Sequence, residues 1–142
     1  MRAVYAAIAA YNVEVEYLIL KTSMCVSGKD NPKQASVDEV AERTVRVLKR
    51  TVPAAQPGVV FLSGGQSDVS ATAHLNAMAA TKGQPWPLTF SYSRALQNPA
   101  LGTWKGQKAN VAAAQRAFHH RAQMNALASQ GKWKPELEKQ AA

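Results

Sequence analysis

The stretch Gly58-Val59-Val60-Phe61-Leu62-Ser63-Gly64-Gly65-Gln66-Ser67 decides the fold of this chain. Val59 to Leu62 form a short apolar run without polar alternation, which predicts a strand buried on both faces. Ser67 and Asp68 supply N-cap chemistry for a helix that runs to about Met78. The turn between strand and helix gathers backbone N–H groups at the positive end of a helix, which predicts an anion site. A plain strand-to-helix turn is the alternative, because Gly-Gly turns are common.

Length and composition are those of one domain. The chain has 142 residues, of which 46% are apolar and can fill a core. No stretch reaches the roughly 18 consecutive apolar residues of a membrane helix, so we expect no membrane association. The run from Ala3 to Ala10 is similar to a signal core, but Tyr11, Asn12 and Glu14 follow it without a cleavage site. Cys25 is the only cysteine, which excludes an internal disulfide and favours a reducing compartment such as the cytoplasm.

The net charge of +8 raises the question of nucleic-acid binding. The basic residues are scattered, with Lys49 and Arg50 as the tightest pair and no run of five or more. We therefore expect no dedicated nucleic-acid site. An anionic small substrate such as a phosphate ester needs only two or three positioned cations and accounts for the charge equally well.

Strands and helices are expected to alternate along the chain. The predicted helices cover residues 1–10, 36–50, 67–78 and 110–129, with a short helical turn at 98–104, and the predicted strands cover 13–20, 59–62 and 86–92. This alternation predicts an α/β fold with a parallel sheet and right-handed crossovers. Three strands are too few to close a barrel, so the sequence is typical of part of a larger structure.

Capping signals and apolar spacing define the helices further. Ser36 and Glu39 form a capping box at the start of the second helix. Apolar spacing predicts buried faces in two later helices, formed by Val69, Ala73 and Ala77 in one and by Val111, Ala114, Phe118, Ala122 and Leu127 in the other. Gly131 is a helix-ending residue. We therefore expect one unit over residues 1–131 and a flexible tail over 132–142, with Trp133 as its anchor.

The three histidines carry no predicted site. His74 lies inside a predicted helix and is expected to be structural or solvent-facing. His119 and His120 are adjacent on a predicted helix and point in different directions, so they are not a ligand pair. No metal site is expected.

Polar residues follow each predicted strand. Lys21 ends the first, Ser63-Gly64-Gly65 follows the second, and Ser91-Tyr92-Ser93-Arg94 follows the third. All three ends lie on one edge of a parallel sheet, where ligands bind. Arginine grips phosphate beside backbone N–H donors, and an amine enclosed by apolar residues is nucleophilic toward a carbonyl. The combination suggests Schiff-base chemistry on a phosphorylated ketone or aldehyde, although Lys21 is equally explained as a lysine that snorkels to solvent.

Four strings of sequence together resemble class I fructose-bisphosphate aldolase. They are Leu20-Lys21, Phe61-Leu62-Ser63-Gly64-Gly65-Gln66-Ser67, Leu88-Thr89-Phe90-Ser91-Tyr92-Ser93-Arg94-Ala95-Leu96-Gln97 and Leu127-Ala128-Ser129-Gln130-Gly131-Lys132. The match runs from about Val4 to Lys134. The family is a (β/α)8 barrel, so the resemblance implies a partial TIM barrel, its last three parallel strands with their helices.

The resemblance also implies a reaction and a site. Lys21 matches the family's Schiff-base lysine, and the residues that match its phosphate contacts are Leu62, Ser63, Gly64, Gly65, Ser91, Ser93 and Arg94. The implied reaction is the reversible cleavage of fructose 1,6-bisphosphate to dihydroxyacetone phosphate and glyceraldehyde 3-phosphate, with no cofactor. The implied partners are the phosphorylated sugar and either the missing barrel half or further copies, since the family is usually tetrameric.

The sequence departs from the family at four points. The family's Lys-Pro-Asn-Met is here Lys21-Thr22-Ser23-Met24, and its Ser-Tyr-Gly-Arg has Ser93 in place of glycine, which would crowd the phosphate if the backbone needs a positive φ. The chain ends in Gln140-Ala141-Ala142 without the family's terminal tyrosine. The first five strands and the acid/base residues are absent, so we expect little or no turnover by this chain alone. The alternative is a non-catalytic aldolase-derived fragment that binds phosphate esters or proteins.

Overall fold

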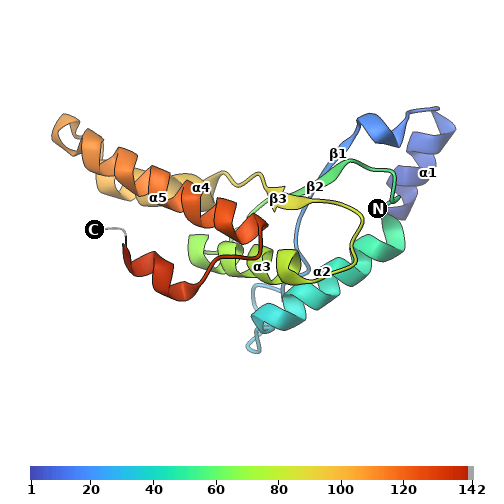
Figure 1. Ribbon diagram of the computed structural model, residues 1–142, viewed down its shortest axis with the longest axis horizontal. Coiled ribbons are helices and arrows are strands. Elements are labelled where there is room, and N and C mark those ends of the chain that lie inside the picture. The colour runs from blue at the N-terminus through green and yellow to red at the C-terminus, as the bar shows by residue number, and fades with distance from the viewer. Residues whose placement is uncertain (141–142) are drawn as a thin grey trace.

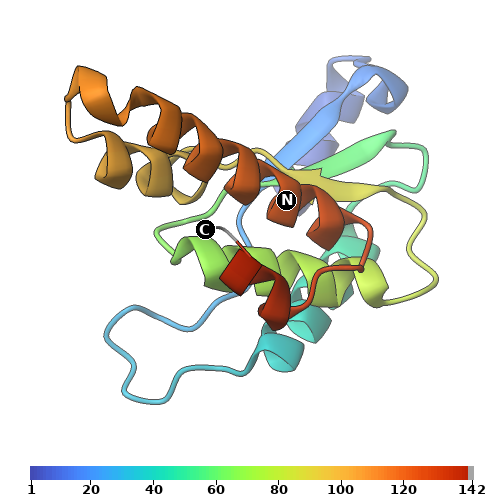
Figure 2. The same cartoon turned by 60° about the vertical axis from the view of Figure 1, so that its left-hand side comes forward.

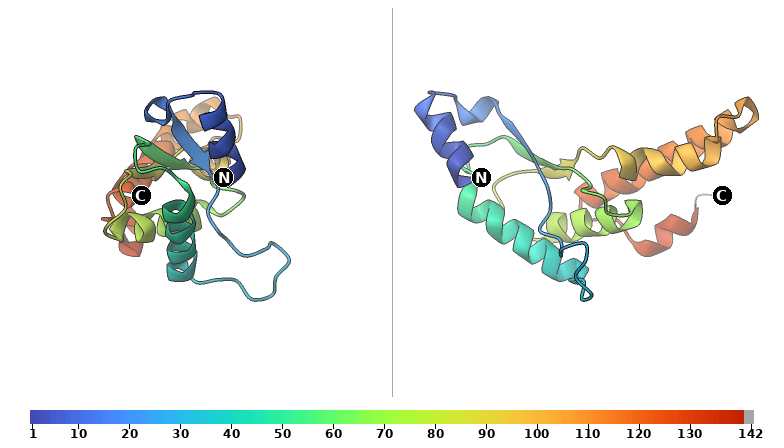
Figure 3. Two further views of the ribbon diagram at one scale, coloured as in Figure 1. Left: turned by 90° about the vertical axis from the view of Figure 1, so that its right-hand side faces the viewer. Right: turned by 180° about the vertical axis from the view of Figure 1, so that it is seen from behind.

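The computed structural model describes residues 1–140 and contains a sheet of three strands flanked by helices (Figure 1). In chain order the elements are α1 (Arg2–Ala10), η1 (Val15–Tyr17), β1 (Ile19–Thr22), α2 (Val37–Thr51), β2 (Gly58–Phe61), α3 (Asp68–Ala80), β3 (Leu88–Phe90), α4 (Arg94–Trp104), η2 (Lys108–Asn110), α5 (Val111–Ser129) and η3 (Pro135–Gln140). Helix α1 and the turn between α4 and α5 lie at opposite ends of an elongated molecule (Figures 1 and 3).

The sheet has the order β1-β2-β3, and both neighbouring pairs are parallel. The register pairs Lys21 with Val60, and Phe61 with both Thr22 and Phe90, so the carboxyl ends of the three strands coincide. The sheet is open rather than closed. The predicted α/β fold with the strands of a partial barrel is confirmed.

Only one face of the sheet is well covered. Side chains alternate between the faces of a strand, and on one face Val59 and Phe61 are fully buried against the helices. Helices α2 and α3 lie on this side of the strands (Figures 1 and 2). On the other face Val60 is half-buried and Ile19 is 59% exposed. The predicted burial of the second strand on both faces is therefore wrong, because the described residues supply no second layer.

The first and third strands are shorter than predicted. Alternation over 13–20 predicts one strand, but the structure has η1 there and begins β1 at Ile19. The alternating apolar residues before Ile19 do not form a strand, because they have no core to pack against: Val13 and Tyr17 are 44% and 84% exposed. Lys21 consequently lies within β1 rather than after it. Strand β3 is Leu88–Phe90 instead of residues 86–92.

Helix α2 follows its sequence closely. The Ser36 hydroxyl accepts a hydrogen bond from the Glu39 N–H at 3.2 Å, as the capping box predicts. Val40 and Leu48, 2% and 1% exposed, lie on its buried face. Helix α4, in contrast, begins at Arg94 and not at residue 98, with Pro99 inside it. Proline is usual only in the first turn of a helix, so the sequence around Pro99 does not indicate that the helix begins earlier.

The buried faces of α3 and α5 match the prediction only in part: Ala114 is buried, and Ala73, Ala77 and Leu127 lie half-buried against the core. The residues that α3 buries are Ala71, Thr72, His74, Leu75 and Met78, and those that α5 buries are Ala114, Arg121, Met124, Asn125 and Ala128. Val69 is 41% exposed, and Val111 and Phe118 are 40% and 41% exposed. Both helices are rich in alanine, so apolar spacing alone does not identify the buried face.

Residues 132–139, expected to be loose, pack against the helices. Trp133 is 8% exposed, as expected of an anchor, and its backbone N–H donates to Asn76 Oδ1 at 2.9 Å. Arg121 of α5 donates two hydrogen bonds to the Glu138 carboxylate of η3, at 2.9 and 2.6 Å. Of the expected tail, residues 141–142 lie outside the described part of the chain.

Candidate functional site at the carboxyl edge of the sheet

The carboxyl ends of the three strands form one edge, which we call the carboxyl edge. Two backbone hydrogen bonds join the segments that leave the strands there: Leu62 N–H donates to the Thr22 carbonyl at 3.0 Å, and Ser91 N–H donates to the Phe61 carbonyl at 2.8 Å. The strand register brings Lys21 to this edge with the segments that start at Leu62 and Ser91. All segments predicted to carry site residues therefore meet at one place.

Lys21 lies on the open face of the sheet. Its register partner is Val60, whose own partner on the third strand is Thr89, so the three side chains share one face. Val60 and Thr89 are half-buried, whereas Lys21 is exposed. The described residues thus place the amine at the carboxyl edge. They do not enclose it in the apolar surroundings that the sequence predicted.

The residues Ser63-Gly64-Gly65-Gln66, which we call the glycine turn, connect β2 to α3. Gly64 and Gly65 have φ values of 60° and 85°, a backbone conformation that favours glycine. Gln66 N–H closes the turn on the Ser63 carbonyl at 3.1 Å, and the N–H groups of Gly64 and Gly65 donate no hydrogen bond within residues 1–140. Ser67 caps α3 by accepting from Ser70 N–H, as predicted.

The side chain of Gln66 lies behind the glycine turn and bonds to two of its neighbours. Its Nε2 donates to the Ser63 carbonyl at 2.8 Å, and its Oε1 lies 2.5 Å from His74 Nδ1. His74 is 8% exposed, and burial lowers its pKa from the ordinary histidine value. The sequence left His74 either structural or solvent-facing, and the structure shows it buried beside the site.

The segment after β3 presents a second set of donors. Helix α4 begins at Arg94, and the N–H groups of Leu96 and Gln97 bond to the Ser93 carbonyl at 3.1 and 3.0 Å. The N–H groups of Arg94 and Ala95 have no acceptor among residues 1–140. Ser93 has a φ of −97°, so a side chain is accommodated there without a positive φ.

Tyr92 fixes this second segment on α3. Its ring is 6% exposed, and its hydroxyl donates to the Ala71 carbonyl at 2.8 Å. Burial raises the pKa of the Tyr92 phenol well above its usual value, so the group stays neutral and donates the hydrogen bond. Tyr92 therefore holds Ser91 and Ser93 close to the start of α3.

A charged cluster lies behind the site, at the start of α3. The buried guanidinium of Arg121 bonds to Glu138 and lies 3.7 Å from the carboxylate of Asp68, the first residue of α3. Burial alone raises the pKa of Glu138, but the hydrogen bonds from Arg121 and Trp133 and the charges of Arg121 and His120 outweigh burial, and the net shift is downward. The cluster ties η3, α5 and the start of α3 together.

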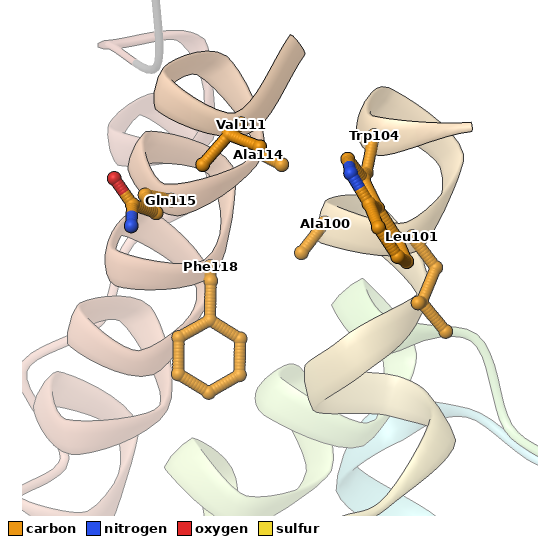
Figure 4. Close-up of a pocket in the computed structure, with 7 residues that line it drawn as sticks. All are labelled: Ala100, Leu101, Trp104, Val111, Ala114, Gln115 and Phe118. Atoms are coloured by element: carbon orange, nitrogen blue, oxygen red, sulfur yellow. The ribbon is translucent and has the colours of Figure 1, made fainter. Parts of the chain in front are cut away.

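A hydrophobic groove between α4 and α5 lies apart from these residues. Figure 4 shows the residues that line it, which are Ala100, Leu101 and Trp104 on α4 and Val111, Ala114, Gln115 and Phe118 on α5. Its lining is almost entirely apolar and includes no charged group, so it offers no acid or base. In the described part of the chain, no group of three or more His, Cys, Asp or Glu is placed to hold a metal ion. No helix of residues 1–140 has the length and apolar character that crossing a bilayer requires.

Comparison with known proteins gives a consistent result. A model of the family "Fructose-bisphosphate aldolase class-I" matches residues 1–142. The chain is 53% identical over 135 residues to a probable class 1 fructose-bisphosphate aldolase of Xylella fastidiosa, covering 94% of this chain and 40% of that protein. It is 48% identical to the fructose-bisphosphate aldolase of Dictyostelium discoideum, covering 94% of this chain and 37% of that protein.

The same family appears among solved structures. The fructose-bisphosphate aldolase of Plasmodium falciparum, crystallised with TRAP and a small-molecule inhibitor, aligns with a TM-score of 0.91 and 46% identity over 94% of this chain and 38% of its own. The chain spans about two fifths of the length of the curated relatives it matches. Because the family model covers every residue and the fold agrees, the chain belongs to the class I fructose-bisphosphate aldolase family, of whose barrel it is a C-terminal portion.

Proposed function

We propose that this chain carries the Schiff-base lysine and one phosphate grip of a class I fructose-bisphosphate aldolase. The reaction is the reversible cleavage of fructose 1,6-bisphosphate to dihydroxyacetone phosphate and glyceraldehyde 3-phosphate. One observation carries the proposal: the parallel register brings Lys21, the glycine turn and Arg94 to the same carboxyl edge. An imine-forming amine and an anion grip are both required to act on a phosphorylated ketone.

The phosphate grip consists of two segments. The glycine turn offers the N–H groups of Gly64 and Gly65, and the start of α4 offers those of Arg94 and Ala95, at a helix end that favours negative charge. The residues assigned to the grip are Leu62, Ser63, Gly64, Gly65, Ser91, Ser93 and Arg94. The exposed Arg94 guanidinium adds the cation that a phosphate monoester prefers.

Lys21 supplies the covalent chemistry. Its Nζ adds to the ketone carbon of the sugar, and loss of water from the carbinolamine leaves an iminium ion. The hydroxyl of the departing aldehyde then gives its proton to a base, the electron pair of the breaking C–C bond forms a C=C bond, and the C=N π pair moves to the nitrogen, which leaves an enamine. Protonation of the enamine carbon and hydrolysis of the resulting iminium ion by water release dihydroxyacetone phosphate and the free Lys21 amine. None of the assigned residues of this chain is that base, so we infer little or no turnover by the chain alone.

The natural partner is the remainder of a barrel. β1 and β3 are the outer strands of the open sheet, so each offers one unpaired edge. Strands of a second polypeptide or of further copies would pair there, cover the open face and enclose Lys21. We propose a cytoplasmic protein that reaches activity only in such an assembly.

Complementation tests this proposal. The chain is mixed with a polypeptide that carries the first five strands of an aldolase relative, and cleavage of fructose 1,6-bisphosphate is followed by a coupled assay. We expect activity from the mixture, and none when Lys21→Ala replaces the wild type. The matched control is Lys33→Ala, an exposed lysine of the loop after β1, which should leave the activity unchanged. An active Lys21→Ala mixture would contradict the proposal.

A non-catalytic phosphate-ester-binding fragment is the second candidate, because the described residues leave Lys21 exposed. The complementation assay, combined with a calorimetric titration of the chain with dihydroxyacetone phosphate, separates the two functions. Binding of dihydroxyacetone phosphate without cleavage in any mixture would favour the fragment.

A further inference from the structure

The side chain of Gln66 links the glycine turn to helix α3 through two hydrogen bonds. Together the two bonds fix the orientation of its amide group. The Ser63 carbonyl accepts only, so the amide nitrogen of Gln66 faces it at 2.8 Å and the amide oxygen faces His74. Because that oxygen also accepts only, His74 Nδ1 carries the hydrogen and donates at 2.5 Å. A single orientation of the amide satisfies both contacts.

The two residues that Gln66 contacts, Ser63 and His74, are both buried. Ser63 is 6% exposed and His74 is 8% exposed, and the neighbours of His74 on α3 include the fully buried Leu75. Gln66 Nε2 also lies 3.6 Å from the sulfur of Met24, a buried residue of the segment after β1. Gln66 therefore connects all three of the turn, the helix and the loop that follows Lys21.

Besides this side chain, the glycine turn is closed by the hydrogen bond from the Gln66 backbone N–H to the Ser63 carbonyl at 3.1 Å, while the N–H groups of Gly64 and Gly65 donate no hydrogen bond within residues 1–140. Gly64 and Gly65 have no side chain and positive φ values, so their backbone is intrinsically free to rotate. The Ser63 carbonyl and the Gly64 N–H belong to one planar trans peptide unit, and they point in opposite directions. A side chain that holds the carbonyl oxygen from the interior therefore directs the Gly64 N–H outward.

We propose that Gln66, held by His74, is a positioning residue that aims the N–H group of Gly64 at a phosphate monoester. The inference deepens the proposed function and rests on it. Neither side chain touches the phosphate; Gln66 acts on the peptide unit and His74 acts on Gln66.

Phosphate titration of the full chain tests the proposal. Inorganic phosphate is added at constant ionic strength, and the amide signals of Gly64 and Gly65 are followed by ¹⁵N–¹H NMR. We expect saturable shifts in the wild type and an affinity about tenfold lower in Gln66→Met, which keeps the side-chain length but loses both hydrogen bonds. His74→Leu should weaken binding in the same direction and add nothing in the Gln66→Met background.

Gln56→Met is the matched control. Gln56 is 3% exposed, precedes the opposite end of β2 and accepts a 2.5 Å hydrogen bond from the Tyr5 hydroxyl. Its replacement removes a buried glutamine contact far from the turn, so phosphate affinity should equal that of the wild type. An equal loss of affinity in both glutamine variants would show general destabilisation and overturn the inference.

The remaining outcomes separate the two proposals. A wild-type chain without saturable shifts at Gly64 and Gly65 would overturn the proposed phosphate grip, and the positioning role with it. A wild type that binds, together with a Gln66→Met variant that binds equally well, would overturn the positioning role alone. Additive effects of Gln66→Met and His74→Leu would contradict the inference that the two residues act as one unit.

Discussion

His74 is a buried imidazole whose protonation opposes folding. Burial lowers its folded pKa below the ordinary value of 6.5. The unfolded chain therefore binds a proton at a pH where the folded chain does not. Stability is fully present above about pH 6.5 and is lost as pH falls toward the folded pKa.

We therefore expect the free energy of unfolding to decrease between about pH 6.5 and pH 5. Urea unfolding across this range measures it. His74→Asn should flatten the profile, and the exposed control His119→Asn should leave it unchanged. Glu138, whose folded pKa is also lowered, loses its contribution only below the ordinary glutamate value of 4.5, so the two windows are separate. A His74→Asn profile with the wild-type slope would contradict this assignment.

The positions of the candidate site residues in the fold were predictable because they follow from where the strands end. Lys21, the glycine turn and Arg94 follow or end apolar runs, and a parallel sheet gathers such ends. The contact between Gln66 and His74 was not predictable, because it joins a turn to a helix across eight residues with no regular spacing. The exposure of Lys21 depends on a covering layer that the described residues do not contain.

At the scale of the element, capping signals were more reliable than apolar spacing. Ser36 and Ser67 accept the hydrogen bonds expected of N-caps, because capping depends on a few neighbouring residues. The buried faces of α3 and α5 depend on which neighbour packs against an alanine-rich surface. The ends of β1 and β3 likewise depend on where β2 offers partners.

The end of α5 requires a glycine. Gly131 has a φ of +67°, and a β-carbon there would lie 3.1 Å from the backbone nitrogen and Cα of Ala80. We expect Gly131→Ala to destabilise the fold by more than the roughly 1–2 kcal/mol of a left-handed alanine, measured by urea unfolding. Gly106→Ala is the control, since Gly106 has a φ of +73° in open space and carries only the conformational term. Equal losses at both positions would show that contact with α3 contributes nothing.

The Arg121–Glu138 ion pair fastens η3 to α5. Arg121 is 2% exposed, so removing its main carboxylate leaves a buried charge with Asp68 at 3.7 Å as its remaining acidic neighbour. We expect Glu138→Gln to cost about 2 kcal/mol of unfolding free energy, whereas Glu136→Gln, an exposed carboxylate of the same segment, should cost nothing measurable. Hydrogen exchange at Trp133 should increase in the first variant only. Unchanged stability in Glu138→Gln would show that the pair does not hold the segment.

At the scale of the whole molecule, the chain spans about two fifths of the length of its aldolase relatives. The alternation of strands and helices predicted three parallel strands and an incomplete barrel, because topology rules depend on the order of elements more than on their exact ends. Two outer strand edges follow from a sheet of only three strands, whereas the exposure of side chains on the open face could not be predicted, since burial depends on what else is present. The three strands nonetheless end at one common edge, where the candidate site lies.

The most direct test is to identify which lysine forms an imine at the carboxyl edge. The chain is incubated with fructose 1,6-bisphosphate and sodium borohydride, and the trapped adduct is located by digestion and peptide mass mapping. We expect the adduct on the peptide that contains Lys21 and its loss in Lys21→Ala. An adduct on a different lysine, or one undiminished in Lys21→Ala, would contradict the central claim that β1 delivers the reactive amine to the phosphate grip.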